Sequence, residues 1–151
     1  MCMFVLNILV LKDFESNKKM NRLKQSILIA EDNQFTALQY NRILGKYGHQ
    51  VLITKDGEEC LKKYRESYEK IKKNDQLIEP FDVVILDQSM PKKTGREVAE
   101  VILKINPNQR IVFASAYNVA KENESLEDLE EKFEFLQKPF SLSKFVRQIG
   151  N

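Results

Sequence analysis

From Ser26 onward, short apolar runs alternate with segments whose apolar residues recur every three or four positions. Five of the apolar runs have the length of a β-strand: residues 27–30, 51–54, 83–86, 111–114 and 133–137. Three of these runs, 27–30, 83–86 and 111–114, are apolar throughout. Continuous apolar runs of this length are typical of strands that are buried on both faces of a parallel sheet.

The segments between these runs predict amphipathic helices. Their apolar residues at helical spacing are Leu61, Tyr64, Tyr68 and Ile71, then Val98, Val101, Ile102 and Ile105, and finally Leu142, Phe145, Val146 and Ile149. Asn33 and Ser141 are placed as helix N-caps, and Gly48 is placed as a helix terminator. Strand and helix thus alternate five times. This order predicts right-handed crossovers and a doubly wound α/β domain, with a five-stranded parallel sheet and helices on both faces.

The predicted domain covers residues 25–151. Residues 1–24 show neither a sustained helical period nor a strand period, and they predict an N-terminal extension. Met20 lies just before the first convincing element, so this extension is either disordered or an artefact of the assigned start site.

Charge and cysteine content narrow the classes of function. Lysine plus arginine number 24 against 22 for aspartate plus glutamate, which argues against broad binding of nucleic acid or of an anionic membrane. Cys2 and Cys60 alone do not make a disulfide framework. The apolar run 3–11 is too short to span a bilayer and lacks the pattern of a signal peptide. We expect a cytoplasmic protein with no direct contact to nucleic acid or membrane.

Polar residues follow the ends of four predicted strands: Glu31 and Asp32, then Asp87, then Ser115, and finally Lys138. In doubly wound sheets the reactive groups gather beyond the carboxyl ends of the strands. Three carboxylates at one edge repel one another, and either raised pKa values or a bound cation must relieve the repulsion. Mg²⁺ suits such a site because it takes few carboxylates, several waters and phosphate oxygens.

Asp87 is the candidate nucleophile for a phosphoryl group. Residues 83–86 fix its backbone in the core while its side chain emerges at the sheet edge. The loop that follows ends near Gly95, and a backbone carbonyl in it, that of Ser89, is expected to complete the metal shell.

Five motifs in order carry a resemblance to a known family. They are ILIAEDN at 27–33, LDQSMP at 86–91, Gly95, Ser115-Ala116, and LQKPF at 136–140. Over residues 26–150 the chain resembles the receiver domain of two-component response regulators, of the stand-alone chemotaxis-regulator type. The resemblance implies the flavodoxin-like strand order 2-1-3-4-5.

The resemblance also implies roles at the metal and phosphate site. Asp87 would accept phosphate from the phosphohistidine of a sensor histidine kinase or of a histidine phosphotransfer protein. Asp32 would bind Mg²⁺ directly and Glu31 through a coordinated water. Lys138 would pair with the phosphoryl group, and the Lys138-Pro139 bond is expected to be cis.

Further residues are implied in switching and in phosphate lifetime. Ser115 would donate its hydroxyl to the new phosphate, and Phe135 would turn inward into the space that Ser115 vacates. Ser89 and Tyr117 flank the site by their positions in the sequence, so we expect them to influence how fast water removes the phosphate, with the bulky Tyr117 shielding it. The signal would pass to a downstream protein through the face from the fourth to the fifth helix.

The chain departs from the family pattern in two places. Residues 130–133 read Glu-Glu-Lys-Phe where the family often has a glycine-alanine pair. The sequence therefore does not define where the preceding helix ends. Phe135 stands where some members have tyrosine.

Simpler interpretations stand beside these. Glu31 and Asp32 could cap a helix in water, and Phe135 could belong to the core. The acidic run 122–134 could be a solvated helix face or a contact surface for a basic partner, while the charged segment 62–73 is expected to be solvated. His49, in the loop after Gly48, is expected at the surface.

Three rival functions fit the sequence less well. A degenerate receiver would act as an adaptor independent of phosphorylation, and an α/β phosphatase would need a second aspartate where this chain has Ser89. A nucleotide-binding flavodoxin-like domain would need a phosphate-binding loop after the first strand, where Glu31 and Asp32 would repel phosphate unless a cation intervened. We expect no enzyme activity beyond the domain's own aspartyl phosphorylation and dephosphorylation.

Overall fold

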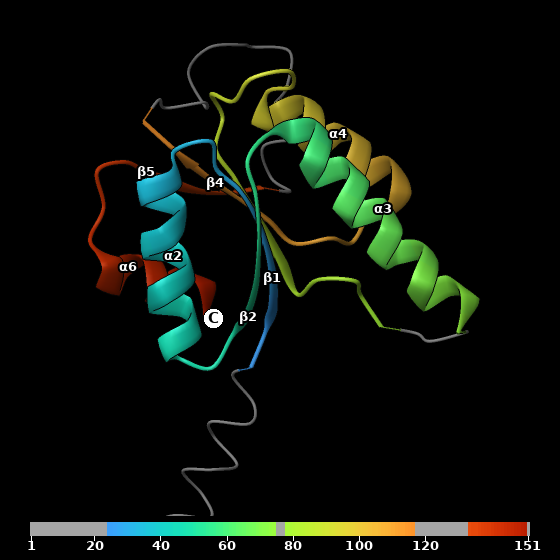
Figure 1. The fold of residues 1–151 in the computed structure, drawn as a ribbon, viewed down its shortest axis with the longest axis horizontal. Helices are drawn as coiled ribbons and strands as arrows, with labels where there is room; N and C mark the ends of the chain where they lie inside the picture. The colour runs from blue at the N-terminus through green and yellow to red at the C-terminus, as the bar shows by residue number, and fades with distance from the viewer. Residues whose placement is uncertain (1–23, 75–77, 117–132, 151) are drawn as a thin grey trace, which may run out of the picture.

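A computed structural model describes residues 24–74, 78–116 and 133–150 of the chain (Figure 1). Its elements are β1 (Ser26–Ala30), α2 (Gln34–Lys46), β2 (Gln50–Thr54), α3 (Gly57–Lys73), β3 (Val83–Leu86), α4 (Gly95–Ile105), β4 (Ile111–Ser115), β5 (Phe133–Gln137) and α6 (Leu142–Ile149). The strands pair in parallel in the order β2-β1-β3-β4-β5. The predicted fold is confirmed. The N-terminal extension up to residue 23 and the helix expected between β4 and β5 lie outside the described residues.

The three strands that the sequence predicted to be buried occupy the centre of the sheet. Every residue of β3 and β4 is buried, and so is all of β1 except Ser26, whereas the edge strands β2 and β5 are partly exposed. Alternate residues of the strands face opposite sides. Leu28, Val84 and Phe113 pack with α3 and α4, whereas Ile29, Ile85 and Val112 pack with α2 and α6. Figure 1 shows the two helix pairs on opposite sides of the sheet.

The predicted helix ends are confirmed in atomic detail. The side chains of Asn33 and Ser141 accept hydrogen bonds from the backbone N–H groups three residues on. Gly48 follows α2 with φ +86°, a value that favours glycine. Its N–H donates to the Gly45 carbonyl and the next N–H donates to the Leu44 carbonyl, which is the Schellman arrangement. After this turn the chain continues directly into β2.

His49 is buried, with 8% of its surface exposed, so the expectation of a surface residue was wrong. The tight turn at Gly48 places His49 directly before β2, beside the first residues of β1. There its Nδ1 accepts a hydrogen bond of 3.2 Å from the Gln25 backbone N–H. Burial lowers the pKa of His49, against a smaller opposing effect of Asp82.

The lowered pKa of His49 predicts that acid destabilises the fold. The unfolded chain takes up a proton near pH 6.5, whereas the folded chain does so only at lower pH, so the unfolded state binds more protons in between. The stability that His49 provides is fully present above about pH 6.5 and falls as pH drops below it, by at most about 1.4 kcal/mol per pH unit for one proton. Chemical denaturation between pH 5 and 8 measures this slope.

The matched variant is His49→Gln, because an amide oxygen can accept the Gln25 N–H bond and does not titrate. This is the chain's only histidine, so the variant should show a shallower pH slope than the wild type below about pH 6.5. Equal slopes in the two proteins would contradict the assignment.

Arg110 ties β4 to β5 and α6 at the end of the sheet where β4 begins. Its guanidinium binds both carboxylate oxygens of Glu134, at 2.6 and 3.0 Å, and donates to the carbonyls of Gln148 and Ile149. These carbonyls end α6, where a cation is favourable. Glu134 therefore lies in a strand with an arginine partner, so the interpretation of 122–134 as one solvated helix face was wrong at this residue. Residues 122–132 lie outside the described part of the chain.

Among the described residues, no helix is both long and apolar enough to cross a membrane.

Candidate metal centre

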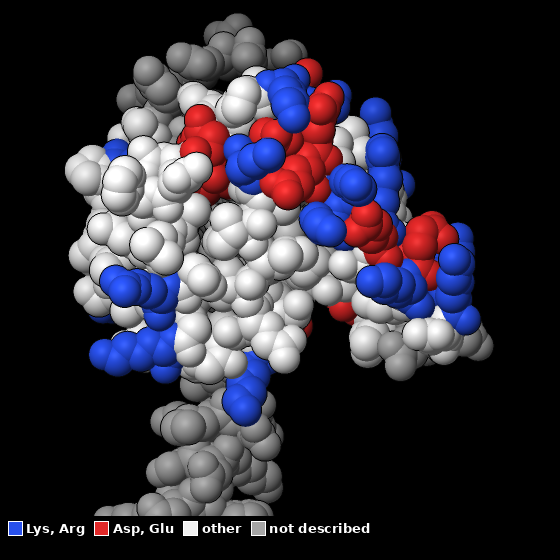
Figure 2. Space-filling view, viewed as in Figure 1, with Lys and Arg blue, Asp and Glu red and all other residues white. Residues whose placement is uncertain are grey.

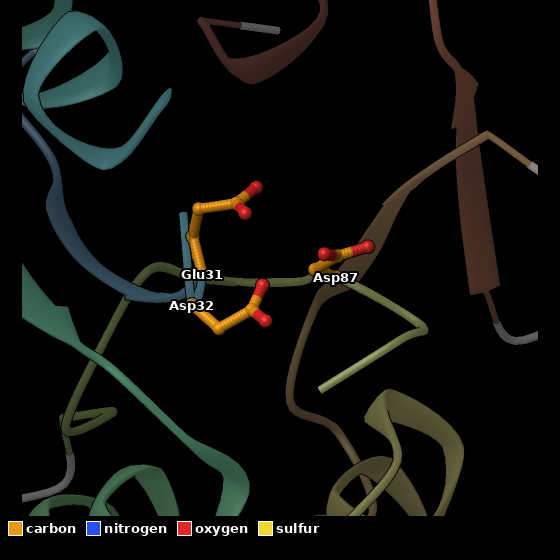
Figure 3. A group of neighbouring side chains, drawn as sticks. All are labelled: Glu31, Asp32 and Asp87. Carbon is orange, nitrogen blue, oxygen red and sulfur yellow. The ribbon is translucent and has the colours of Figure 1, made fainter. Parts of the chain in front are cut away.

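Three carboxylates meet at the carboxyl edge of the sheet. Glu31 and Asp32 follow β1, and Asp87 follows β3. Ala30 pairs with Leu86, and the Asp87 N–H donates to the Ala30 carbonyl at 3.0 Å, so the two strands end at the same level. One carboxylate oxygen from each residue lies within 4.8 Å of the others. Figure 3 shows the three side chains converging from the two strand ends.

Lys138 enters the same site from the end of β5. Its ammonium lies 2.9 Å from Glu31 Oε2 and 3.9 Å from Asp87 Oδ1. The peptide bond between Lys138 and Pro139 is cis, as predicted. One ammonium against three carboxylates leaves a net formal charge of minus two, which favours a divalent cation.

The environment of Asp87 disfavours its charge in the absence of a metal. Burial raises the pKa of its carboxyl, and the neighbouring Glu31 and Asp32 raise it further. Lys138 and the backbone N–H of Ser89 act in the opposite direction and are outweighed. A bound cation would favour the ionised, nucleophilic form.

The donor set fits Mg²⁺. Carboxylate oxygens are hard ligands, and Asp32 is exposed while Asp87 is half-buried, which leaves access for water and for a phosphate. Glu31 differs from both, because it is 3% exposed and each of its carboxylate oxygens already accepts a hydrogen bond. Oε1 accepts from the Asn33 N–H at 3.1 Å and Oε2 accepts from Lys138. These contacts suit an indirect role for Glu31, with Asp32 and Asp87 as the direct ligands.

The other predicted residues lie around this centre. Ser115 ends β4 and is buried, and its carbonyl accepts the Lys138 N–H at 2.8 Å. Phe135 on β5 is 37% exposed and stacks on Phe113, with ring centroids 5.6 Å apart. Ser89 is exposed in the loop after Asp87, and the proposed role of its carbonyl stays a prediction. Tyr117 lies outside the described residues.

Sequence reasoning missed a cluster of three aromatic rings, Tyr40, Phe140 and Phe145, that packs next to the turn at Lys138 and Pro139. The ring of Tyr40 stacks on Phe145 at 4.5 Å and on Phe140 at 6.0 Å, and Phe140 follows the cis proline. Burial, together with the charges of Glu31 and Asp87, raises the pKa of the Tyr40 hydroxyl. The spacing of Ala37, Tyr40 and Leu44 marks the buried face of α2, but it could not show that this face supports the lysine turn.

Gly95, which the sequence marked only as part of a motif, is sterically required. A Cβ at this position would lie 2.3 Å from the Asp87 carbonyl oxygen, and the Gly95 N–H donates to the Gln88 carbonyl. The first residue of α4 therefore packs directly against the backbone of the candidate nucleophile.

Comparison with known proteins agrees with this geometry. The family model of the response regulator receiver domain matches residues 27–150. The chain belongs to this family, and it is a receiver domain of two-component signalling.

Individual relatives differ widely in length. The chain is 28% identical to the chemotaxis protein CheY of Thermotoga maritima over 126 residues, which cover 82% of this chain and 93% of that protein. It is 32% identical over 87 residues to the hybrid signal transduction histidine kinase I of Dictyostelium discoideum, covering 58% of this chain but 5% of that protein. A solved CheX-CheY-BeF3-Mg complex from Borrelia burgdorferi contains a chain that is 28% identical, with a TM-score of 0.65, covering 82% of this chain and 85% of that one.

Proposed function

We propose that this protein is a phosphoacceptor response regulator in which Asp87 takes a phosphoryl group from a phosphohistidine in the presence of Mg²⁺. The observation that carries the proposal is the convergence of Glu31, Asp32 and Asp87 within 4.8 Å, with the Lys138 ammonium 3.9 Å from Asp87. The similar Borrelia burgdorferi structure is of a complex that contains Mg²⁺, which supports the choice of ion.

The chemistry follows from these positions. An oxygen of the Asp87 carboxylate attacks the phosphorus, the bond from phosphorus to the donor imidazole nitrogen breaks, and the imidazole leaves as a neutral ring that keeps the proton already on its other nitrogen. Bound by Asp32 and Asp87, Mg²⁺ would supply positive charge to the phosphoryl oxygens. Lys138 stands close enough to move from Glu31 toward the new charge. Asp87 gains about two negative charges in the product.

The added charge would act on the groups beside Asp87. Ser115 would donate its hydroxyl to a phosphoryl oxygen, and Phe135, now partly exposed on Phe113, would turn inward. Because Phe135 is partly exposed on the edge strand β5, this change would alter the surface around β5, and we propose that a downstream protein binds the face from the fourth to the fifth helix. The phosphodonor would be a sensor histidine kinase or a histidine phosphotransfer protein. The phosphoryl group would end on the protein's own aspartate, so we propose a cytoplasmic signalling protein rather than an enzyme.

Magnesium should stabilise the protein through Asp32. At a Mg²⁺ concentration 100 times the dissociation constant, binding adds about 2.7 kcal/mol to the free energy of unfolding. Asp32→Asn should lose most of this gain, because it removes one direct ligand. The same change should leave the metal-free protein at least as stable as the wild type, since it relieves repulsion.

Thermal unfolding with and without Mg²⁺, in chelator-treated protein, measures both effects. Glu66→Gln, which removes an exposed carboxylate on α3, serves as the control and should respond to Mg²⁺ like the wild type. An equal Mg²⁺ response in Asp32→Asn and the wild type would remove Asp32 from the metal site.

The proposed function is tested by incubating the protein with acetyl phosphate and Mg²⁺ and measuring its intact mass. We expect one labile phosphoryl group per chain, and none when the metal is chelated. Failure of the wild type to take up phosphate with Mg²⁺ present would contradict the proposal and favour a phosphorylation-independent adaptor.

A further inference from the structure

We propose that Lys92 is a positioning residue that holds the loop after Asp87 through its ion pair with Asp56, and so sets the affinity of the site for Mg²⁺. This inference rests on the proposed function, because it concerns the same metal site. Neither residue was singled out by the sequence, and neither belongs to the carboxylate cluster.

The ion pair joins the loop to the start of α3. The Lys92 ammonium lies 2.8 Å from Asp56 Oδ2, and the Asp56 side chain is only 4% exposed. The other Asp56 oxygen accepts the Glu59 N–H at 2.8 Å as the N-cap of α3. Glu58 is a weaker partner of Lys92, at 3.6 Å and with its side chain largely exposed. Asp56 is therefore the buried member of the ion pair, held by a second hydrogen bond, and Lys92 is its exposed partner.

The backbone at Lys92 explains why an anchor is needed. Lys92 has φ +67°, the one positive value outside glycine among the described residues. The Lys93 N–H donates to the Pro91 carbonyl at 2.8 Å, which closes a three-residue γ-turn around Lys92. A γ-turn with positive φ is rare and strained, and such strain persists only where surrounding contacts hold it.

Two glycines show how closely the loop is packed. A Cβ at Gly57, beside Asp56, would lie 2.7 Å from both the Cβ and the carbonyl oxygen of Lys93. Gly95, two residues after Lys93, packs against the Asp87 carbonyl at the start of the loop. Ser89 lies between Asp87 and Lys92; its backbone N–H is a donor that lowers the pKa of the Asp87 carboxyl, and its carbonyl is the predicted metal ligand. Relaxation of the turn at Lys92 would therefore move groups that contact Asp87 and the ion.

A positioning role for Lys92 and a general effect of its charge predict opposite changes in Mg²⁺ affinity when Lys92 is removed. Figure 2 shows acidic and basic side chains intermixed on the face over α3, so this region carries no uniform field. A cation near an acidic pocket weakens binding of a second cation by repulsion, so removal of Lys92 through charge alone would strengthen Mg²⁺ binding. Removal of Asp56 through charge alone would weaken it. The positioning role predicts weaker binding in both cases.

The test compares Lys92→Ala, Asp56→Asn and the double variant with the wild type. Asparagine retains the N-cap of α3, so Asp56→Asn removes the ion pair without removing the cap. Lys92→Arg should restore the pair, and Glu58→Gln is the matched control, because it removes only the weaker partner. Mn²⁺ binding is followed by electron paramagnetic resonance, and Mg²⁺ affinity is obtained by competition.

We expect Mg²⁺ affinity to fall about tenfold in Lys92→Ala and in Asp56→Asn, the scale found for outer partners of metal ligands, and to fall no further in the double variant. Lys92→Arg and Glu58→Gln should bind within about twofold of the wild type. In phosphorylation by acetyl phosphate, the half-saturating Mg²⁺ concentration should rise, while the rate at saturating Mg²⁺ stays near that of the wild type. A loss of fold stability alone would not raise the half-saturating Mg²⁺ concentration while leaving the rate at saturating Mg²⁺ unchanged.

Unchanged or tighter binding in Lys92→Ala, or additive losses in the double variant, would overturn the inference. If Lys92→Ala fails to fold, Lys92→Gln takes its place, and unchanged or tighter Mg²⁺ binding in that variant would overturn the inference equally. Failure of the proposed function is a separate result, because it appears as a wild type that binds Mg²⁺ and takes up no phosphate.

Discussion

Replacement of Asp87 by asparagine should abolish phosphate uptake from acetyl phosphate, with a loss of at least about a thousandfold in rate, as expected when a nucleophile is removed. The amide is almost the same size as the carboxylate, so the site keeps its shape while losing the attacking oxygen. The change also removes one charge from a crowded carboxylate cluster, so the metal-free fold should be no less stable than the wild type. Intact mass and thermal unfolding measure the two effects.

Asp82→Asn provides the matched control, because Asp82 immediately precedes β3 whereas Asp87 immediately follows it. The Asp82 carboxylate accepts the Ser26 N–H at the opposite edge of the sheet. Its variant should take up phosphate at the wild-type rate. Retained uptake in Asp87→Asn would mean that another group is the acceptor.

Gly95→Ala should both destabilise the fold and slow phosphorylation. The added methyl group would lie 2.3 Å from the Asp87 carbonyl oxygen, a backbone atom that cannot rotate away. Overpacking of this kind costs about 1–3 kcal/mol. The required shift of the Asp87 backbone should also slow phosphate uptake by at least about tenfold, because misplacement of a reacting group is costly.

Gly45→Ala is the opposite case within the same chain. Gly45 lies in α2, and a Cβ added there would meet nothing within 4 Å, so alanine should stabilise the protein by about 0.5–1 kcal/mol and leave phosphorylation unchanged. Urea denaturation of the two variants measures the difference in sign. A Gly95→Ala protein as stable and as active as the wild type would show that α4 and the Asp87 backbone can separate without cost.

Much of the fold could be predicted because its signals are local. The apolar runs of β1, β3 and β4 are buried on both faces, and the caps Asn33 and Ser141 form the expected hydrogen bonds. The site could be predicted because parallel strands bring their carboxyl ends to one edge, so residues that follow different strands meet. This is why Asp32, Asp87 and Lys138 could be grouped from positions more than 50 residues apart.

The contacts that were missed depend on the packing of distant segments. Burial of His49 follows from how the chain re-enters β2 beside the start of β1, and the helical period does not encode it. Glu134 looked like one more acid in a charged run until β5 placed it against Arg110. The Lys92–Asp56 pair joins two loops through a backbone turn with positive φ, which a lysine in the sequence does not signal.

The most direct test of the central claim is to locate the phosphate on the chain. Borohydride reduction of the phosphorylated protein converts an aspartyl phosphate to homoserine, which tandem mass spectrometry of the peptides can place at a single residue. We predict the mark at Asp87 alone, formed only with Mg²⁺ present. A mark at Asp32 or Glu31, or on a residue outside the carboxylate cluster, would contradict the assignment of Asp87 as the acceptor.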